Sequence, residues 1–421
     1  MKKRVLLLTY GRLPVPAVCG GAIETLLDTL IEENEKHQLL ELFVISREDS
    51  AIEPFNHTHQ ATQVIPVKTR EHPILWFFQK CVNKVLAVLD GKKRLLIPYP
   101  ALIAETKDVL QEQPMDCVID LNCPERILSL REFYSGKLAV YLHNNYLNQQ
   151  LAYGEQILQQ LDGVISVCDF LNQQVKTIPA NETEPQFFRV NNGIDLTSYQ
   201  PPELEERKSW REKFNIEEQE CVIVFFGRVT ETKGVHLLLE ALSQIECLVK
   251  VKVLIIGGIT YSSAQEDSYV KRVKAQAEKL PIDVVFTGYV NKEEIPDYLK
   301  AADICAVPSI FHETCCLSAV EAQAMGIPVI ATKIGGIPEY ISQDSALLID
   351  YDKYFVENFA KGLDQLIHHP EFRAYLQAEA IKQRNQHSKE RYYKEFVTSV
   401  EQLIAEQHKG TTRLKEKRKI Q

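Results

Sequence analysis

The stretch Cys221–Gly234, CVIVFFGRVTETKG, decides the fold of this 421-residue chain. A run of apolar, β-prone residues ends in a glycine, and the polar loop that follows ends in a second glycine. After Val235, the residues HLLLEALSQI carry apolar side chains at the i, i+3 and i+4 spacing of a helix buried on one face. A strand, a glycine-containing loop and a helix form the repeating unit of doubly wound parallel sheets.

Similar apolar runs alternate with helical patterns along the whole chain. The strands predicted before this stretch are Val5–Tyr10, Leu42–Ser46, Gln63–Val67, Cys117–Asp120, Leu138–Leu142 and Val164–Val167. From this stretch onward they are Cys221–Phe226, Lys252–Ile256, Asp283–Phe286, Ile304–Val307, Pro328–Ala331 and Ala346–Ile349. Such alternation predicts an α/β protein with two Rossmann-like, doubly wound domains.

The segment Tyr199–Trp210, YQPPELEERKSW, separates the two series of strands. It is rich in proline and charge, as interdomain linkers are, which predicts a hinge near residue 200. We therefore expect an N-terminal domain at 1–198 and a C-terminal domain at 199–387. A helix at about 388–405 should pack back on the N-terminal domain. Residues 406–421 are strongly basic and predict a solvated tail.

Composition excludes several classes of protein. Apolar residues make up 45% of the chain and charged residues 25%, which is the balance of a globular protein and not of a collagen, a disordered chain or a polytopic membrane protein. The net charge of −9 gives no overall attraction to nucleic acid. The ten cysteines include no C-x-x-C pair, and most lie in apolar runs as small buried hydrophobes.

The N-terminus, MKKRVLLLTYGRLP, has a basic start and a short apolar run. It lacks a small-residue cleavage site, so it predicts a first buried strand and not a signal peptide. No apolar run approaches the length of a membrane-spanning helix. We expect a cytoplasmic protein.

Candidate binding groups lie in the loops that follow the strands, where doubly wound domains hold their ligands. Neither G-x-G-x-x-G nor a P-loop is present. Gly20-Gly21, before a predicted helix, would let backbone amides approach an anion, although a plain tight turn is the alternative. Arg228 and Lys233 leave one strand end together and could hold a diphosphate. The alternative there is a pair of solvated loop cations.

A third loop, FHETCCLSAVE at Phe311–Glu321, brings two carboxylates into one element. Glu313 precedes a predicted helix, and Glu321 lies about two turns into it. The backbone amides of Thr314–Leu317 could form an anion-binding nest. Ordinary helix electrostatics, which favours acidic residues near a helix N-terminus, is the alternative.

These elements together resemble glycosyltransferase family 4. The resemblance rests on G-R-x-x-x-x-K-G, on E-x7-E with the GIPVIAT that follows it, and on VNNGID, FTGYV and IGGIPEYI in the same order. It covers nearly all of residues 190–345, and Gly20-Gly21 and His143 match in the N-terminal half. The resemblance implies the GT-B fold, two Rossmann-like domains facing across a cleft. It also implies retaining transfer from a nucleotide-sugar in the synthesis of bacterial cell-surface polysaccharide or glycoconjugate.

The resemblance also implies roles for individual residues. Arg228 and Lys233 would bind the donor diphosphate, and Glu321 would bind the ribose hydroxyls. The catalytic set would be Glu313 against the donor sugar and His143 near the reaction centre, together with the two cations. Further donor contacts would come from Gly20, Gly21, Tyr289, Val290, Thr314, Cys315, Cys316 and Leu317. Many members have Phe-Gly where this chain has Cys315-Cys316, which predicts a reshaped sugar pocket and a thiol of low pKa.

The implied mechanism is a front-face displacement with retention through an oxocarbenium-like transition state. It needs charge stabilisation on the leaving diphosphate, and no side-chain nucleophile, cofactor or metal. Asp350-Tyr351-Asp352 spells the D-x-D of metal-dependent transferases but follows a late strand, so we expect no metal there. The expected reaction moves a hexose-type sugar, from a UDP-sugar by preference, to a glycan, lipid-linked or protein acceptor. A catalytically silent partner subunit and a nucleotide-sugar epimerase are the alternatives.

Residues 72–97, HPILWFFQKCVNKVLAVLDGKKRLLI, combine an apolar stretch with five basic residues. This composition is typical of an interfacial helix and predicts peripheral contact with an anionic membrane surface. A core helix followed by a basic loop is the alternative.

Overall fold

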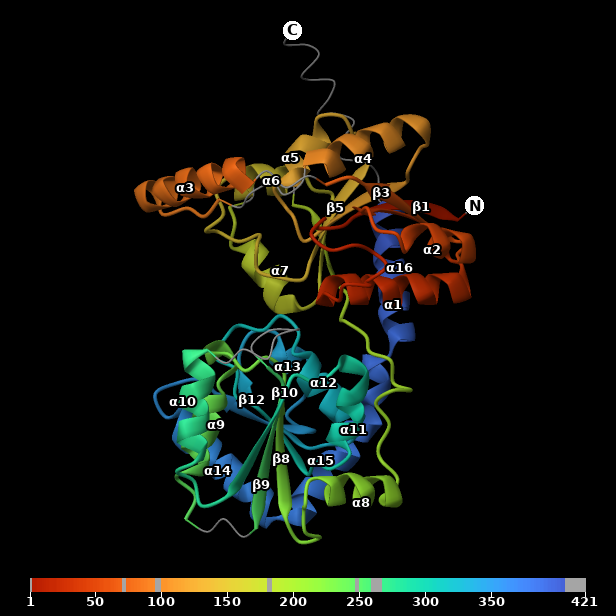
Figure 1. The fold of residues 1–421 in the computed structure, drawn as a ribbon. Helices are drawn as coiled ribbons and strands as arrows, with labels where there is room; N and C mark the ends of the chain where they lie inside the picture. The colour runs from red at the N-terminus through yellow and green to blue at the C-terminus, as the bar shows by residue number, and fades with distance from the viewer. Residues whose placement is uncertain are drawn as a thin grey trace. The chain divides into compact units, whose positions relative to one another are not determined.

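A computed structural model describes residues 2–69, 73–94, 100–179, 184–246, 250–258 and 267–405 (Figure 1). The chain forms two compact units. The first contains residues up to Gly193 together with the segment from Lys389 onward, and the second is Ile194–Ser388. Helix α16 (Lys389–Ala405) therefore belongs to the first unit, where it packs against α1 (Ala22–His37).

The first unit is built on a parallel sheet of seven strands. Their order is β3 (Thr62–Val67), β2 (Leu40–Arg47), β1 (Lys3–Leu8), β4 (Cys117–Leu121), β5 (Lys137–Leu142), β6 (Gly163–Ser166) and β7 (Gln186–Arg189). The remaining helices of this unit are α2 (Ile52–Thr58), α3 (Pro73–Asp90), α4 (Pro100–Glu112), α5 (Arg126–Arg131), α6 (Gly154–Gln160) and α7 (Asp169–Lys176).

The second unit has a parallel sheet of six strands with helices on its faces (Figure 1). The strand order is β10 (Asp283–Gly288), β9 (Val251–Ile256), β8 (Cys221–Phe226), β11 (Ile304–Val307), β12 (Val329–Lys333) and β13 (Ala346–Asp350). Its α-helices are α8 (Leu204–Lys213), α9 (Val235–Leu242), α10 (Ser268–Ala277), α11 (Ile295–Leu299), α12 (Leu317–Ala324), α13 (Ile337–Tyr340), α14 (Phe355–His368) and α15 (Pro370–Gln383). Three short 3-10 helices are η1 (Glu231–Lys233), η2 (Lys292–Glu294) and η3 (Arg384–His387).

The predicted fold class is confirmed. Every strand predicted from the sequence is present, and both sheets are parallel, as the alternation of strands and helices indicates. The structure adds β7, which the sequence analysis missed. This strand is a four-residue edge strand, QFFR, whose residues are at most half-buried. Too few residues are present for a period-two pattern to be recognisable.

The domain boundaries differ from the predicted 198/199 and 387/388. The structure divides the chain after Gly193 and again after Ser388. The two segments that begin and end the second unit are joined by a hydrogen bond from the amide of Ile194 to the carbonyl of His387 at 2.8 Å. The predicted linker at Tyr199–Trp210 is not free chain. Tyr199 is buried, and α8 begins at Leu204 behind a capping box formed by Glu203 and Glu206. The predicted basic tail at 406–421 lies outside the described residues.

The cysteines of the described residues are free thiols. Most are buried, as the sequence predicts, and Cys19 and Cys81 are exposed. Cys247 lies outside the described residues. Among the helices that the structure describes, none combines the length and apolar character needed to span a bilayer.

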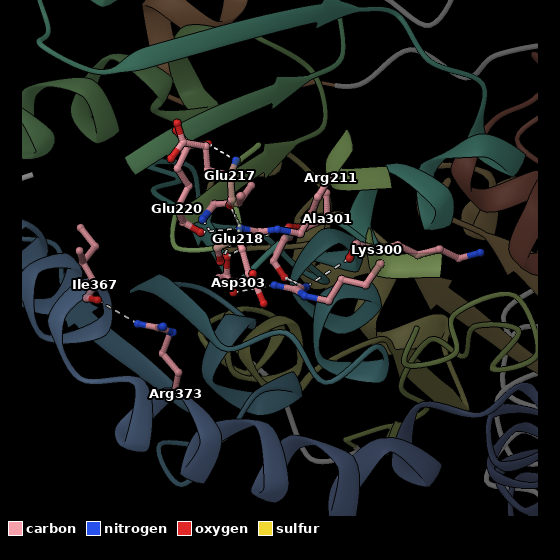
Figure 2. Close-up of polar contacts among 12 residues, drawn as sticks. Arg211, Glu217, Glu218, Glu220, Lys300, Ala301, Asp303, Ile367 and Arg373 are labelled. Carbon is pink, nitrogen blue, oxygen red and sulfur yellow. Dashed lines mark hydrogen bonds and ion pairs between the residues drawn. The ribbon is translucent and has the colours of Figure 1, made fainter. Parts of the chain in front are cut away.

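A hydrogen-bonded network closes the amino end of the second sheet (Figure 2). The guanidinium of Arg211 donates to Asp303 Oδ2 at 3.1 Å and to the carbonyls of Glu217 and Glu220 at 2.7 Å each. Asp303 Oδ2 also accepts from the amide of Val222 in β8 at 2.9 Å. Because Asp303 directly precedes β11, this network fixes the ends of β8 and β11 that lie opposite the loops discussed below.

We expect Arg211→Ala to destabilise the protein by about 3 kcal/mol, because it leaves the Asp303 carboxylate and several carbonyls of a largely buried network without their donor. Lys361→Ala is the matched control. Lys361 and Glu357 form an exposed pair within α14, so its loss should change stability by less than about 1 kcal/mol. Urea denaturation measures both values. Equal losses for the two variants would contradict the structural role given to Arg211.

Candidate functional site

The candidate site lies at the point where the strand order of the second sheet reverses. From β8 the chain builds outward through β9 and β10 on one side, and from β11 through β12 and β13 on the other. Ligands of doubly wound sheets bind at the carboxyl ends of the strands at such a switch point. The loops that start after Phe226 and after Val307 both leave the sheet here.

The loop after β8 is held by its neighbours through backbone hydrogen bonds. The amide of Gly227 donates to the carbonyl of Ile256 at 3.0 Å, and the amide of Val229 donates to that of Gly258 at 2.9 Å. A Cβ on Gly257 would lie 2.0 Å from the carbonyl oxygen of Gly227. The close approach of these backbones therefore requires glycine at 257. Arg228 is exposed on this loop.

Gly234 joins the same loop to α9. Its φ is +74°, and a Cβ there would lie 1.9 Å from the carbonyl oxygen of Pro308. Both the left-handed backbone and the contact exclude a side chain. Gly234 thus brings the loop after β8 directly against the loop after β11.

Lys233 and Glu313 join these two loops through their side chains. Lys233 Nζ donates to Glu313 Oε1, and the two groups form an ion pair in which Glu313 is buried and Lys233 half-buried. Ser309 Oγ donates to the same carboxylate oxygen at 2.8 Å. The amide of Ile310 donates to the carbonyl of Thr232 at 2.9 Å. The carboxylate of Glu313 is therefore held in one position by two donors.

The charge of Lys233 is stabilised by its surroundings. Burial by itself would lower the pKa of the ammonium group, but the negative charges of Cys316, when ionised, and of Glu313 raise it above its ordinary value. The side chain therefore stays protonated at neutral pH. A protonated lysine has three N–H donors, so it can bind an anion while it keeps its bond to Glu313.

A third loop, after β12, supports the backbone of Glu313. The amide of Gly336 donates to the carbonyl of Glu313 at 2.6 Å. Gly335 has a φ of +58°, and a Cβ there would lie 2.4 Å from that carbonyl oxygen. The IGGIPEYI segment therefore positions the backbone of Glu313 by direct contact, with no side chain between the two backbones.

Helix α12 begins directly after these contacts, with Cys316 as its N-cap. The amides of Thr314–Leu317 lie at the entrance of the helix, where the first turn has no acceptor of its own. The prediction of a low-pKa thiol is wrong for Cys316. This side chain is buried, and burial together with the Glu313 carboxylate raises the pKa of its thiol. At neutral pH it is a neutral, apolar wall of the site. Cys315 is half-buried beside it.

Glu321 lies on α12, two turns from Glu313 in sequence, and is buried. Burial raises the pKa of its carboxyl to about 7, against the smaller lowering effects of Lys292 and of a hydrogen bond from Tyr199. The group therefore titrates close to neutral pH. Only in its ionised form are both carboxylate oxygens free of a proton and fully available as acceptors.

Tyr289 and Val290 follow β10, which ends at Gly288 with a φ of +72°. Tyr289 is about half exposed and Val290 is partly buried. The amide of Gly257 donates to the carbonyl of Gly288 at 2.9 Å, so this turn is continuous with the loops after β8 and β9.

His143 belongs to the first unit and follows β5. Its side chain is buried and lines a small apolar pocket with Leu7, Leu27, Tyr141 and Phe396 among others. Burial lowers the pKa of the imidazole to about 3, so the ring is neutral at physiological pH. The amide of His143 donates to Asn122 Oδ1 at 3.1 Å, which fixes its backbone at the end of the strand.

Gly20 and Gly21 also belong to the first unit, before α1. Both have positive φ values, and Gly21 is the N-cap of the helix. A Cβ on Gly21 would lie 2.2 Å from Glu24 Oε2. This carboxyl group is buried in the first turn of α1, and burial raises its pKa. An anion at Gly20-Gly21 would therefore lie close to an acidic side chain.

The structure thus brings Lys233, Glu313, Thr314, Cys316 and Leu317 together in the second unit. Arg228, Cys315, Glu321, Tyr289 and Val290 lie on the same or adjoining loops and helices of that unit, whereas His143, Gly20 and Gly21 lie in the first.

The sequence analysis missed Ser309, which holds Glu313 in position. The available signal was a hydroxyl residue directly after a buried strand, in AVPS. Asp350, in the D-x-D segment, pairs with Lys333 at 3.8 Å. Within the described part of the chain, no three His, Cys, Asp or Glu side chains are grouped so as to hold a metal.

Comparison with known proteins shows what this chain is similar to. Residues 206–383 match the family "Glycosyl transferases group 1". A putative glycosyltransferase, YtcC, of Bacillus subtilis is 28% identical over 84% of this chain and 81% of its own. Among solved structures, a glycosyltransferase from Rickettsia africae superposes with a TM-score of 0.73 at 17% identity, over 96% of this chain and all of that one. Anabaena Alr3699/HepE in complex with UDP superposes with a TM-score of 0.70 at 18% identity, over 96% of this chain and 100% of that one. The same protein in complex with UDP-glucose superposes with a TM-score of 0.66 at 19% identity, over 96% of this chain and 98% of that one. These structures have the predicted GT-B fold, which is confirmed.

Gly234→Ala tests the contact that brings the two loops together. We expect it to lower the free energy of unfolding by about 1–2 kcal/mol for the left-handed backbone and by a further 1–3 kcal/mol for the clash with Pro308. Gly91→Ala is the control, because Gly91 has a similar φ of +68° and no atom near its added Cβ. Chemical denaturation gives both values, and equal losses would show that the contact with Pro308 does not matter.

Proposed function

We propose that this chain, whose residues 206–383 match the group 1 glycosyltransferase family, is a glycosyltransferase that moves a hexose-type sugar from a UDP-sugar to an acceptor with retention of configuration. The acceptor would be a glycan, a lipid-linked or a protein-linked molecule of cell-surface polysaccharide synthesis. The observation that carries the proposal is the bonded set of Lys233, Glu313 and Ser309 at the switch point of the second sheet.

The donor diphosphate would bind where Arg228 and Lys233 supply positive charge. Arg228 is exposed and offers its planar fork, and Lys233 offers the donors that Glu313 does not use. As the bond to the sugar breaks, negative charge develops on the departing diphosphate, and two fixed cations stabilise that charge. In this proposal the cations take the part that a metal ion plays in other transferases.

The two carboxylates would bind different parts of the donor. Glu313, held by Lys233 and Ser309, would lie against the transferring sugar, where positive charge develops in an oxocarbenium-like transition state. Glu321 would accept hydrogen bonds from the ribose hydroxyls, and the backbone near Tyr289 and Val290 would contact the base. The UDP complexes of the Anabaena protein, which shares the fold, support UDP as the nucleotide.

The amides of Thr314–Leu317 and the small side chains of Cys315 and Cys316 would form the wall of the sugar pocket. His143 has a neutral imidazole, so its part in the proposal is hydrogen bonding to the sugar and not proton donation by an imidazolium. At Gly20-Gly21 the contribution would come from the amide of Gly21, because the amide of Gly20 already donates to the carbonyl of Ala17 at 2.9 Å. The reaction is expected in the cytoplasm, where nucleotide-sugars would be available to the site.

Nucleotide binding tests the donor site first. Isothermal titration should show that UDP binds more tightly than GDP or ADP, and that Lys233→Ala weakens UDP binding roughly 10–100-fold, since one charge-assisted contact is worth about 1.5–3 kcal/mol. Lys271→Ala, at an exposed position of α10, is the control and should bind as the wild type does. If none of the three nucleotides bound, the proposed function would be wrong.

The two carboxylates should separate in kinetics and in pH dependence. With a donor and acceptor found by screening UDP-sugars, Glu313→Gln should lower kcat by roughly 10–100-fold, because it removes charge that acts mainly in the transition state. Glu321→Gln should instead weaken the binding of UDP-glucose at pH 8 with little change in kcat.

The sign of the pH effect follows from the raised pKa of Glu321. Below about pH 7 the carboxyl is protonated and loses the charge that strengthens its hydrogen bonds to the ribose hydroxyls. Wild-type affinity for UDP-glucose should therefore fall as the pH is lowered, by up to about tenfold between pH 8 and pH 6. Glu321→Gln should abolish this dependence. A pH dependence that persisted unchanged in the variant would assign the titration to another group.

A further inference from the structure

Helix α3 of the first unit is amphipathic, but its apolar side is the exposed one. Its apolar side chains point away from the protein: Phe77 and Phe78 are 64% and 63% exposed, Val88 and Leu89 are 81% and 77% exposed, and Val82 and Val85 are more than half exposed. A surface helix of a globular protein normally buries such residues. A cluster of this size on a monomeric protein indicates a binding surface.

The exposed apolar residues form one continuous face. At about 100° per residue, the six residues named above fall within an arc of roughly 140° together with the exposed Cys81, and Leu86, which is 37% exposed, widens this side to about 180°. Asn83 and Ala87, which lie on the opposite side of the helix, are less exposed. Asn83 Nδ2 donates to the carbonyl of Arg94 at 3.5 Å, so this side of the helix faces the turn that follows α3. We name the surface formed by Phe77, Phe78, Cys81, Val82, Val85, Val88 and Leu89 the α3 apolar face.

The turn after α3 holds the helix in this orientation. The amide of Lys93 donates to the carbonyl of Gln150, and the amide of Ala152 donates to the carbonyl of Lys93, both at 2.7 Å. Lys92 Nζ donates to the carbonyl of Gln149 at 2.6 Å. The helix is thereby attached to the first unit at its C-terminal end, and it lies at the edge of that unit with no extensive packing against another described element (Figure 1).

Positive charge borders the α3 apolar face. Lys80 and Lys84 are exposed and lie on the helix within about 60° of Phe77. Lys92, Lys93 and Arg94 follow at its C-terminal end. Across 73–94 the acidic side chains are limited to Asp90, which forms an ion pair with Arg94. Five cations against one carboxylate make this segment locally positive in a chain whose net charge is −9.

We propose that the α3 apolar face docks in the plane of an anionic lipid bilayer. The apolar side chains would enter the boundary between headgroups and acyl chains, and the bordering lysines would contact lipid phosphates. A second copy of this chain fits less well, because it would bring the same lysines together without a compensating acid. The proposal rests on α3 and its turn alone and does not depend on the proposed donor site.

Vesicle flotation with the full chain tests this proposal. The probes are vesicles of phosphatidylcholine alone and of phosphatidylcholine mixed with phosphatidylglycerol. We expect binding to the anionic vesicles that weakens at high salt. Val85→Ser/Val88→Ser and Lys80→Ala/Lys84→Ala should each reduce that binding by roughly tenfold or more. Circular dichroism and UDP titration should be unchanged in both variants, because these side chains are exposed.

Matched variants elsewhere on the surface provide the controls. Leu204→Ser removes an 82% exposed apolar side chain from α8, and Lys271→Ala removes an exposed lysine from α10. Both should float as the wild type does. If the α3 variants bound vesicles as well as these controls, or if the wild type did not bind anionic vesicles, the proposal would be overturned. A dimer abolished by Val85→Ser/Val88→Ser, without vesicle binding, would assign the face to a second copy instead.

The wild-type protein also carries its own reporter. Cys81 lies on the α3 apolar face, and Cys19 is an exposed thiol outside it. Anionic vesicles should slow maleimide alkylation of Cys81, measured by peptide mass spectrometry, while alkylation of Cys19 serves as the internal reference. Equal rates at Cys81 with and without anionic vesicles would contradict insertion of this face.

Discussion

Lys233 and Glu313 form an ion pair between the loops after two neighbouring strands, β8 and β11, from which the second sheet builds outward in opposite directions. The pair is possible only because Gly234 lets one loop lie against Pro308 of the other, and because Gly335 lets a third loop support the backbone of Glu313. Ser309 then holds the carboxylate. On the opposite end of the same strands, Arg211 and Asp303 fix β8 and β11 to each other. The proposed donor site thus depends on a small set of rigid contacts at one point in the sheet.

Much of the fold could be predicted because its signals are local. CVIVFF at Cys221–Phe226 is apolar throughout, as a strand buried on both faces must be, and the helix that follows it has a regular apolar spacing. The loops after the strands could likewise be identified as the place for a site, because topology alone puts strand ends at one edge. Strand β7 could not be predicted, since its few residues are only partly buried at an edge.

Features that depend on tertiary contacts could not be predicted from the sequence. The place of Ser309 after a buried strand makes it a candidate, but the sequence does not show that its hydroxyl reaches Glu313. The sequence also does not show that Cys316 is buried deeply enough for its thiol pKa to rise rather than fall. The raised pKa of Glu321 has the same origin in burial. The composition of α3 left open whether its apolar side is buried. The structure shows that side exposed, with the helix attached to the first unit by the turn at Lys93 and with Asn83 bonded to that turn.

We propose above all that a nucleotide-sugar binds at the point where the strand order of the second sheet reverses, at the carboxyl ends of β8 and β11. Hydrogen–deuterium exchange with and without saturating UDP measures the place of binding directly. We predict that UDP slows exchange in peptides covering Gly227–Gly234 and Thr314–Glu321, and leaves the amino end of β8 near Val222 unchanged. Protection confined to the first unit, or absent from both of these peptides when UDP is bound, would contradict the account.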